Sequence, residues 1–83
     1  MTEVLTTDTK FKIKTVFNDF TIRTNLFLET PDFITMVYDA KQQINILCWF
    51  KEGFAKTMPF AKLQHAKVVE ACKAGKFYER FAR

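Results

Sequence analysis

Histidine, glycine, proline and cysteine are scarce in this chain of 83 residues, which holds one His and two each of Gly, Pro and Cys. One histidine and two distant cysteines, Cys48 and Cys72, cannot supply the four ligands of a zinc site, so no metal site is predicted. Neither a Walker A sequence nor a GxGxxG motif is present, which excludes the common phosphate-cradling loops. We therefore expect no cofactor.

The residue sets that catalysis uses are absent as well. A general base is usually a histidine with a positioned partner, and His65 stands alone among helix formers. We interpret it as a surface or half-buried helix residue. Cys48 lies in an apolar run, which indicates a small core residue, whereas Cys72 beside Lys73 is the better candidate for a reactive thiol. The sequence predicts a protein that is not an enzyme.

Long hydrophobic runs are lacking. No apolar stretch approaches the roughly 18 residues of a transmembrane helix. The N-terminal MTEVLTTDTK has no basic start followed by an apolar stretch, so no signal peptide is visible. Without an export signal the cysteines are expected to be reduced thiols, and a cytoplasmic location is predicted.

Aromatic residues are abundant by contrast, with ten Phe in a chain that is 48% hydrophobic. Aromatic side chains bury large areas, so they suffice to fill one small core. Residues 10–83 are predicted to form a single domain. Residues 1–9 are small, polar and without periodicity, which predicts a flexible N-terminal tail.

The first part of the domain predicts a hairpin. Apolar and polar residues alternate from Lys10 to Phe17 and again from Phe20 to Leu28, as half-buried strands require. Asn18-Asp19 between the two runs supplies the turn.

Further strands follow a break at Pro31, which cannot donate to a central ladder. The β-branched and aromatic stretch FITMVYD (33–39) predicts a third strand, and residues 44–50 predict a fourth. Both faces of the fourth strand are apolar near its end, which is typical of a central strand covered on both sides. The stretch FAKTMPF (54–60) predicts a short fifth strand that ends at Pro59.

Helical signals begin at Pro59, because proline is tolerated at the first helical position. The segment FAKLQHAKVVEACKA contains good helix formers, and Gly75 is placed as a stop. The last stretch, KFYERFAR, is either a helical turn or an extended tail. The sequence thus predicts a mainly β fold with a C-terminal helix, as a small antiparallel SH3-like barrel or a strongly curled sheet of about four or five strands.

Three segments, LFLETPDFITMV, CWFKEG and MPFAKL, resemble the YodC-like family of small SH3-like barrels. The matching positions are Trp49-Phe50, Gly53, Met58-Pro59 and Leu63. The chain departs from the family where Glu29-Thr30 replaces a Gly-Gly pair. The resemblance covers about residues 24–65 and implies the barrel without implying a chemistry.

Charge is unevenly distributed along the chain. Residues 1–50 hold five Lys/Arg and six Asp/Glu, a net −1, whereas residues 51–83 hold eight and three, a net +5. Basic residues neutralise phosphates, and exposed aromatics stack on unpaired bases. The predicted nucleic-acid-binding residues are Lys51, Lys56, Lys62, Lys67, Lys73, Lys76, Arg80 and Arg83, extended by Lys12 and Lys14. The alternative is a solvated basic face that only maintains solubility.

The aromatic residues divide between core and contact surface. Those predicted to lie in the core are Phe11, Phe17, Phe20 and Phe50. Those predicted as contact residues are Trp49, Phe77, Tyr78 and Phe81, although each of these also has a packing interpretation. For Trp49, packing under the C-terminal helix is favoured over lining a groove.

These observations predict a small basic binding module for RNA or single-stranded nucleic acid, acting as an accessory or regulatory factor. The alternative is a protein-directed inhibitor or adaptor, for instance a phage-encoded antitoxin-like factor that blocks a host enzyme or toxin. Small size and surplus aromatics favour this second interpretation, because aromatic patches and exposed sheet edges are common docking sites. The sequence leaves the oligomeric state open.

Overall fold

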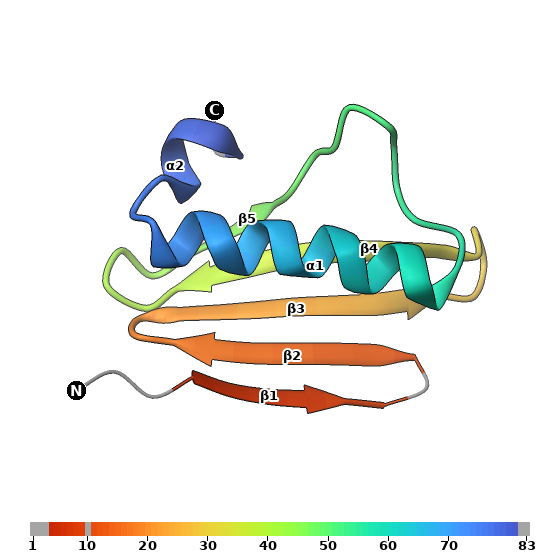
Figure 1. Cartoon of the computed structure of the whole chain (residues 1–83), viewed down its shortest axis with the longest axis horizontal. Helices are drawn as coiled ribbons and strands as arrows, with labels where there is room; N and C mark the ends of the chain where they lie inside the picture. The colour runs from red at the N-terminus through yellow and green to blue at the C-terminus, as the bar shows by residue number, and fades with distance from the viewer. Residues whose placement is uncertain (1–3, 10, 82–83) are drawn as a thin grey trace.

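The structure, a computed structural model, describes residues 4–9 and 11–81. Its elements are β1 (Val4–Asp8), β2 (Lys12–Phe17), β3 (Phe20–Phe27), β4 (Asp32–Asp39), β5 (Ile44–Leu47), α1 (Met58–Lys73) and α2 (Phe77–Arg80). The strands form one antiparallel sheet in the order β1-β2-β3-β4-β5, and α1 crosses one of its faces (Figure 1). The predicted mainly β fold with a C-terminal helix is confirmed. Of the two forms left open, the structure has an open sheet, with β1 and β5 at opposite edges.

The predicted hairpin is confirmed as β2 and β3. Phe17 pairs with Phe20 across a two-residue turn, and Asn18 takes a φ of 53° there. Asparagine tolerates this left-handed conformation better than most residues, which explains why Asn18 can occupy the turn.

The flexible tail predicted for residues 1–9 is wrong for Val4–Asp8, which form β1 and pair with β2 along its whole length. Periodicity did not reveal this strand, because an edge strand that packs little against a core needs no alternation. Its threonines are β-branched and suit a pleated backbone. Residues 1–3 lie outside the described part of the chain.

The predictions for residues 44–60 need two corrections. The fourth predicted strand ends at Leu47 and lies at an edge of the sheet, not in its centre. The predicted fifth strand is reduced to one bridge, in which the Phe33 N–H donates to the Ala55 carbonyl at 2.8 Å. Residues 58–60 of that stretch belong to α1, which begins at Met58 because Pro59 fits the first helical turn.

Gly75 ends α1, as predicted. Its φ of 72° lies in the left-handed region, its N–H donates to the Cys72 carbonyl at 3.2 Å, and the Lys76 N–H donates to the Ala71 carbonyl at 2.8 Å. This pair of bonds is the Schellman arrangement, which turns the chain back on itself. The turn directs α2 onto the core. Of the two forms predicted for the last stretch, residues 77–80 therefore have the helical one. None of the described helices has the length and apolarity needed to span a bilayer.

The core lies between the sheet and the helices. Its main cluster consists of Ile22, Val37, Cys48, Val68, Ala71, Cys72 and Phe77. The predicted core residues Phe17, Phe20 and Phe50 pack against this cluster. Phe11 does not belong to the core, since 48% of it is exposed.

The short α2 is fixed by aromatic packing. Phe77 is 1% exposed, and its ring centroid lies 5.7 Å from that of Phe20 and 6.0 Å from that of Phe81. Aromatic pairs at such separations stabilise a fold beyond the area they bury. The C-terminal segment therefore belongs to the folded domain.

We predict that Phe77→Ala lowers the free energy of unfolding by about 3–5 kcal/mol, because it leaves a large cavity in the core. Phe60→Ala is the matched control. Phe60 is 39% exposed on α1, so the same truncation there should cost less than about 1 kcal/mol. Urea unfolding measures both values, and equal losses would show that α2 is only loosely attached.

Candidate functional site

The face of the sheet opposite α1 carries three basic side chains. Lys12 and Lys14 lie on β2, Arg23 lies on β3, and Lys14 pairs directly with Arg23 in the register. All three are exposed. Because alternate strand residues point to opposite faces, the residues between them, such as Ile13, are buried under α1. We call this uncovered side of the sheet the open face.

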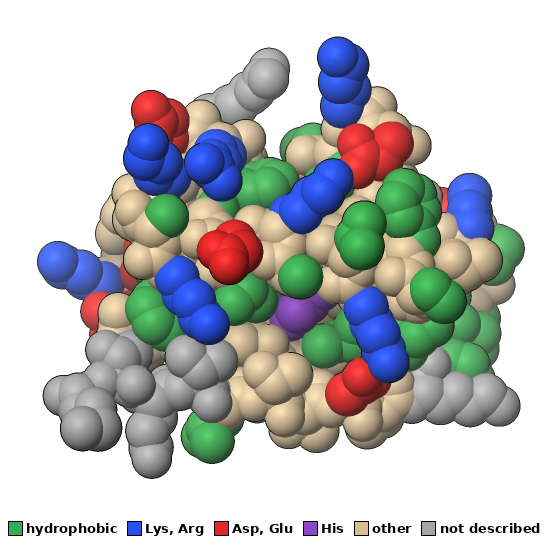
Figure 2. Space-filling model, viewed as in Figure 1, with side chains coloured by type: hydrophobic (Ala, Val, Ile, Leu, Met, Phe, Trp, Pro, Cys, Tyr) green, Lys and Arg blue, Asp and Glu red, His purple; other side chains and the backbone are tan. Residues whose placement is uncertain are grey.

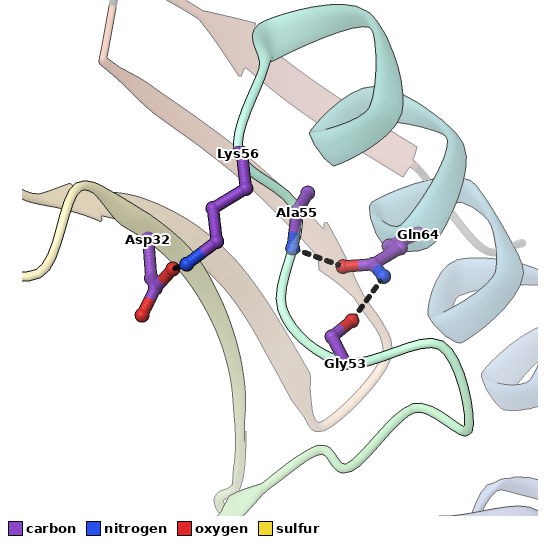
Figure 3. Close-up of polar contacts among 5 residues, drawn as sticks. All are labelled: Asp32, Gly53, Ala55, Lys56 and Gln64. Carbon is purple, nitrogen blue, oxygen red and sulfur yellow. Dashed lines mark hydrogen bonds and ion pairs between the residues drawn. The ribbon is translucent and has the colours of Figure 1, made fainter.

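Around these cations the open face is apolar or neutral. Its half-buried residues are Val16, Thr21, Asn25, Ile34, Met36, Tyr38 and Leu47. Among the described strand residues that point to this side, Asp32 is the one carboxylate, and Lys56 binds it at the end of the sheet (Figure 3). The centre of the open face is therefore positively charged over a largely apolar floor.

Asn25 contributes an unusual group to the open face. It lies beside Lys12 on the neighbouring strand. Its Oδ1 atom is buried without a hydrogen-bond partner, the one such side-chain atom in the described part of the chain. Leaving this buried acceptor unpaired costs free energy.

The basic residues of the C-terminal third lie mostly on the other side, around the helices. Three of them pair with acids, as Lys56 with Asp32, Lys62 with Asp8 at 3.0 Å, and Lys67 with Glu52 at 3.4 Å. Lys51, Lys73, Lys76 and Arg80 have no carboxylate partner within the described residues, and Arg83 lies outside them. Figure 2 shows the basic side chains of the helix side spread out, with acidic ones among them. The structure thus separates the basic residues of the C-terminal third from Lys12 and Lys14, and the two groups of cations do not form one continuous stripe.

The aromatic residues predicted as contacts differ in their exposure to solvent. Phe77 is buried, and Tyr78 and Phe81 pack against the main core cluster. Trp49 is 67% exposed, with its ring centroid 5.3 Å from that of Phe54. The favoured interpretation of Trp49 as a packed residue is therefore wrong, and it lines a surface hollow with Phe50 instead.

Sequence reasoning missed a buried polar network under α1. His65, only 4% exposed, makes a 2.8 Å hydrogen bond through Nε2 with the Thr15 hydroxyl and another through Nδ1 with the Thr24 hydroxyl. The chain of hydroxyls continues from Thr15 to Thr6 at 3.1 Å and from Thr24 to Thr35 at 2.7 Å. Threonines at alternating strand positions were the available signal, but only the register aligns them beneath one helix residue.

Burial, rather than the hydrogen bonds, keeps the histidine of this network neutral. A neutral ring has one N–H donor and one acceptor nitrogen, and two hydroxyls can satisfy both in either tautomer. Burial lowers the pKa of His65 from 6.5 to about 4, and the nearby Asp8 opposes this only in part. His65 is therefore a structural group, and the prediction of a surface or half-buried position is wrong.

Two further polar contacts fasten peripheral segments to the core. Gln64 of α1 donates from Nε2 to the Gly53 carbonyl at 2.8 Å and accepts from the Ala55 N–H at 3.3 Å, which holds the loop before α1 (Figure 3). Tyr78 of α2 donates its hydroxyl proton to the buried Asp39 carboxylate. This bond lowers the pKa of Asp39, while burial and then the bond raise the pKa of Tyr78 to about 12.

Neither cysteine is placed for chemistry. Cys48 is fully buried, as predicted, and Cys72 is 4% exposed. Burial raises the pKa of Cys48 to about 12 and that of Cys72 to about 11. Cys72 is the less buried of the two, as the sequence interpretation ranked them, but a thiol without access or thiolate character is a poor nucleophile.

We predict that stability falls as the pH is lowered from 6.5 to 4. The unfolded chain protonates its histidine near 6.5 while the folded chain resists protonation until about 4, so the unfolded state binds more protons in this window. The slope contributed by one such group is about 1.4 kcal/mol per pH unit. Urea unfolding at several pH values measures it.

His65→Gln is the matched variant for this experiment, since glutamine can hydrogen bond but does not titrate. It should be less stable at pH 7 and should lack the histidine slope, while the carboxylates Asp39 and Glu52 act equally in both proteins. Identical slopes in the two proteins would contradict the buried neutral histidine.

We also predict that both thiols react with an aromatic disulfide reagent only after unfolding. The native rate should be at least about a hundredfold below that in urea, because both groups are buried and protonated. Fast modification of one thiol in the native protein would contradict the burial of that cysteine.

Comparison of this chain with protein-family models, with curated proteins and with solved structures gave no match. The resemblance to the YodC-like family therefore stays a prediction, and the proposals for function depend on the geometry described above.

Proposed function

We propose that this protein binds single-stranded nucleic acid, with RNA as the main candidate, on the open face of its sheet. The observation that carries the proposal is the cluster of Lys12, Lys14 and Arg23 on this face. Asp32 is the one carboxylate among the described strand residues that point to the face, and Lys56 pairs with it at the end of the sheet. The protein would act as a non-enzymatic accessory or regulatory factor in the cytoplasm.

The chemistry of the face suits an unpaired strand. Three adjacent cations on two neighbouring strands can follow a phosphate backbone, because backbone neutralisation supplies most of the affinity for nucleic acid. The half-buried Tyr38 and the thioether of Met36 offer flat or deformable apolar surface beside Arg23, with which Met36 pairs in the register. Bases can stack on such side chains only when the bases are not paired with another strand.

A second copy of the chain is a poorer occupant of the open face. Packing two such faces together would bring two sets of Lys12, Lys14 and Arg23 into one interface without acids to balance them. Burying unpaired charge is strongly unfavourable. A polyanion removes that cost, so charge complementarity favours nucleic acid.

The cations on the helix side have a supporting role. Lys51, Lys73, Lys76 and Arg80 are exposed and unpaired within the described residues, and the chain has a net charge of +4. They raise the rate of encounter with a polyanion through the overall field. The contacts themselves are assigned to the open face.

The test is fluorescence anisotropy with a labelled single-stranded RNA of about 12 nucleotides at several salt concentrations. Three phosphate contacts at about 0.7 each predict that the logarithm of the binding constant falls by about two per tenfold increase in salt. Lys12→Glu combined with Lys14→Glu should weaken binding at least about tenfold.

The matched control is Lys73→Glu combined with Lys76→Glu, which changes the net charge equally but on the helix side. It should weaken binding much less than the open-face pair, and a duplex of the same sequence should bind less well than the single strand. Equal losses for the two pairs, or affinity independent of salt, would contradict a site on the open face.

A further inference from the structure

A second candidate surface lies at the free edge of β5, where a hollow of about 990 Å³ opens between the helices and the loop before α1. Its lining residues are Asn45, Ile46, Leu47, Trp49, Phe50, Lys51, Glu52, Lys67, Arg80 and Phe81. Figure 2 shows the surface hollowed at the top, between α2 and this loop, and Figure 1 shows β5 beneath it. The hollow is distinct from the centre of the open face.

The hollow borders unpaired backbone groups. β5 is bonded to β4 on one side only, and the Cys48 N–H donates to the Thr35 carbonyl at 3.0 Å. Because backbone groups alternate in direction along an antiparallel strand, those of Ile44 and Ile46 also point to β4. The N–H and C=O groups of Asn45 and Leu47 therefore point to the free edge, where an added strand can pair with them.

The side chains of the hollow combine apolar area with positive charge. Trp49 is 67% exposed, and it lines the hollow together with Phe50 and Phe81. Lys51 and Arg80 have no carboxylate partner within the described residues, while the Lys67 charge is offset by Glu52 at 3.4 Å. Three cations against one acid leave a net +2 on the lining.

We propose that this hollow binds an acidic protein segment in extended form, which adds a strand to the β5 edge and places its carboxylates beside Lys51 and Arg80. Backbone pairing at a sheet edge supplies affinity, and alternate side chains supply specificity. The proposal does not depend on nucleic-acid binding by the open face, and it gives the protein a second partner of a different class.

The edge favours a peptide over the other occupants. A nucleic acid cannot form a strand ladder with the backbone groups of Asn45 and Leu47. A second copy pairing edge to edge would bring its own Lys51 and Arg80 against those of the first, which like-charge repulsion disfavours. An acidic chain satisfies both the backbone groups and the charge.

The single tryptophan makes the test direct, because Trp49 is the only one in the chain. The probe is a capped peptide of about eight residues that alternates Asp with Val or Leu and has no aromatic residue. We expect a saturable change in Trp49 fluorescence below about 1 mM. A peptide with Lys in place of each Asp should bind at least about tenfold more weakly.

Two variants separate backbone pairing from charge. Asn45→Pro removes the outward N–H but leaves the ladder to β4 intact, since proline is accepted on edge strands, and it should abolish binding. Its matched control, Asn45→Ala, keeps the N–H and should bind within about threefold of the wild type. Lys51→Glu combined with Arg80→Glu should weaken binding at least about tenfold.

The open-face pair Lys12→Glu and Lys14→Glu should leave peptide binding unchanged while it weakens RNA binding, so the two proposals can fail separately. Should Asn45→Pro not fold, amide exchange of the wild type decides: the peptide should protect the amides of Asn45 and Leu47 more than that of Ile46. Three outcomes would overturn the proposal. The acidic peptide could bind Asn45→Pro and Asn45→Ala with equal affinity, or the lysine peptide could bind the wild type as well as the acidic one does. The third is a concentration-dependent dimer that blocks the edge.

Discussion

The packing of α1 on one side of the sheet is the contact on which the remaining structure depends. The 16 residues of α1 pack on one face of the sheet, over β2, β3 and β4, and the described part of the chain provides no second layer. Half of the strand side chains therefore stay at the surface whatever their chemistry. The open face and the free edge of β5 are both consequences of this one-sided cover.

The covered side has an unusual composition for a small core. His65 and its threonines occupy the centre of the helix–sheet contact, where aliphatic side chains would normally pack. A polar network of this kind is favourable only when every member is paired, and here the hydroxyls and both ring nitrogens are paired. It fixes the register of α1 over β2 and β3, because a shift of one residue would leave the imidazole among apolar groups.

The two proposed surfaces differ in the physics that would operate at each. Lys12, Lys14 and Arg23 lie on a face of side chains, which suits a ligand recognised through charge and stacking. The β5 edge presents N–H and C=O groups beside Trp49, which suits a ligand with peptide groups that can pair with them. If both proposals hold, the protein would join an acidic protein segment to a nucleic acid.

The amino-acid sequence by itself determined the β-rich class, the hairpin at Asn18-Asp19, the helix after Met58 and its stop at Gly75. These features follow from local periodicity and from the backbone preferences of single residues. Only the tertiary structure decided that Val4–Asp8 form a strand, that His65 is buried, and that the C-terminal cations lie apart from those on β2. Such outcomes depend on which strands pair and which face a helix covers, and those contacts join residues far apart in the chain.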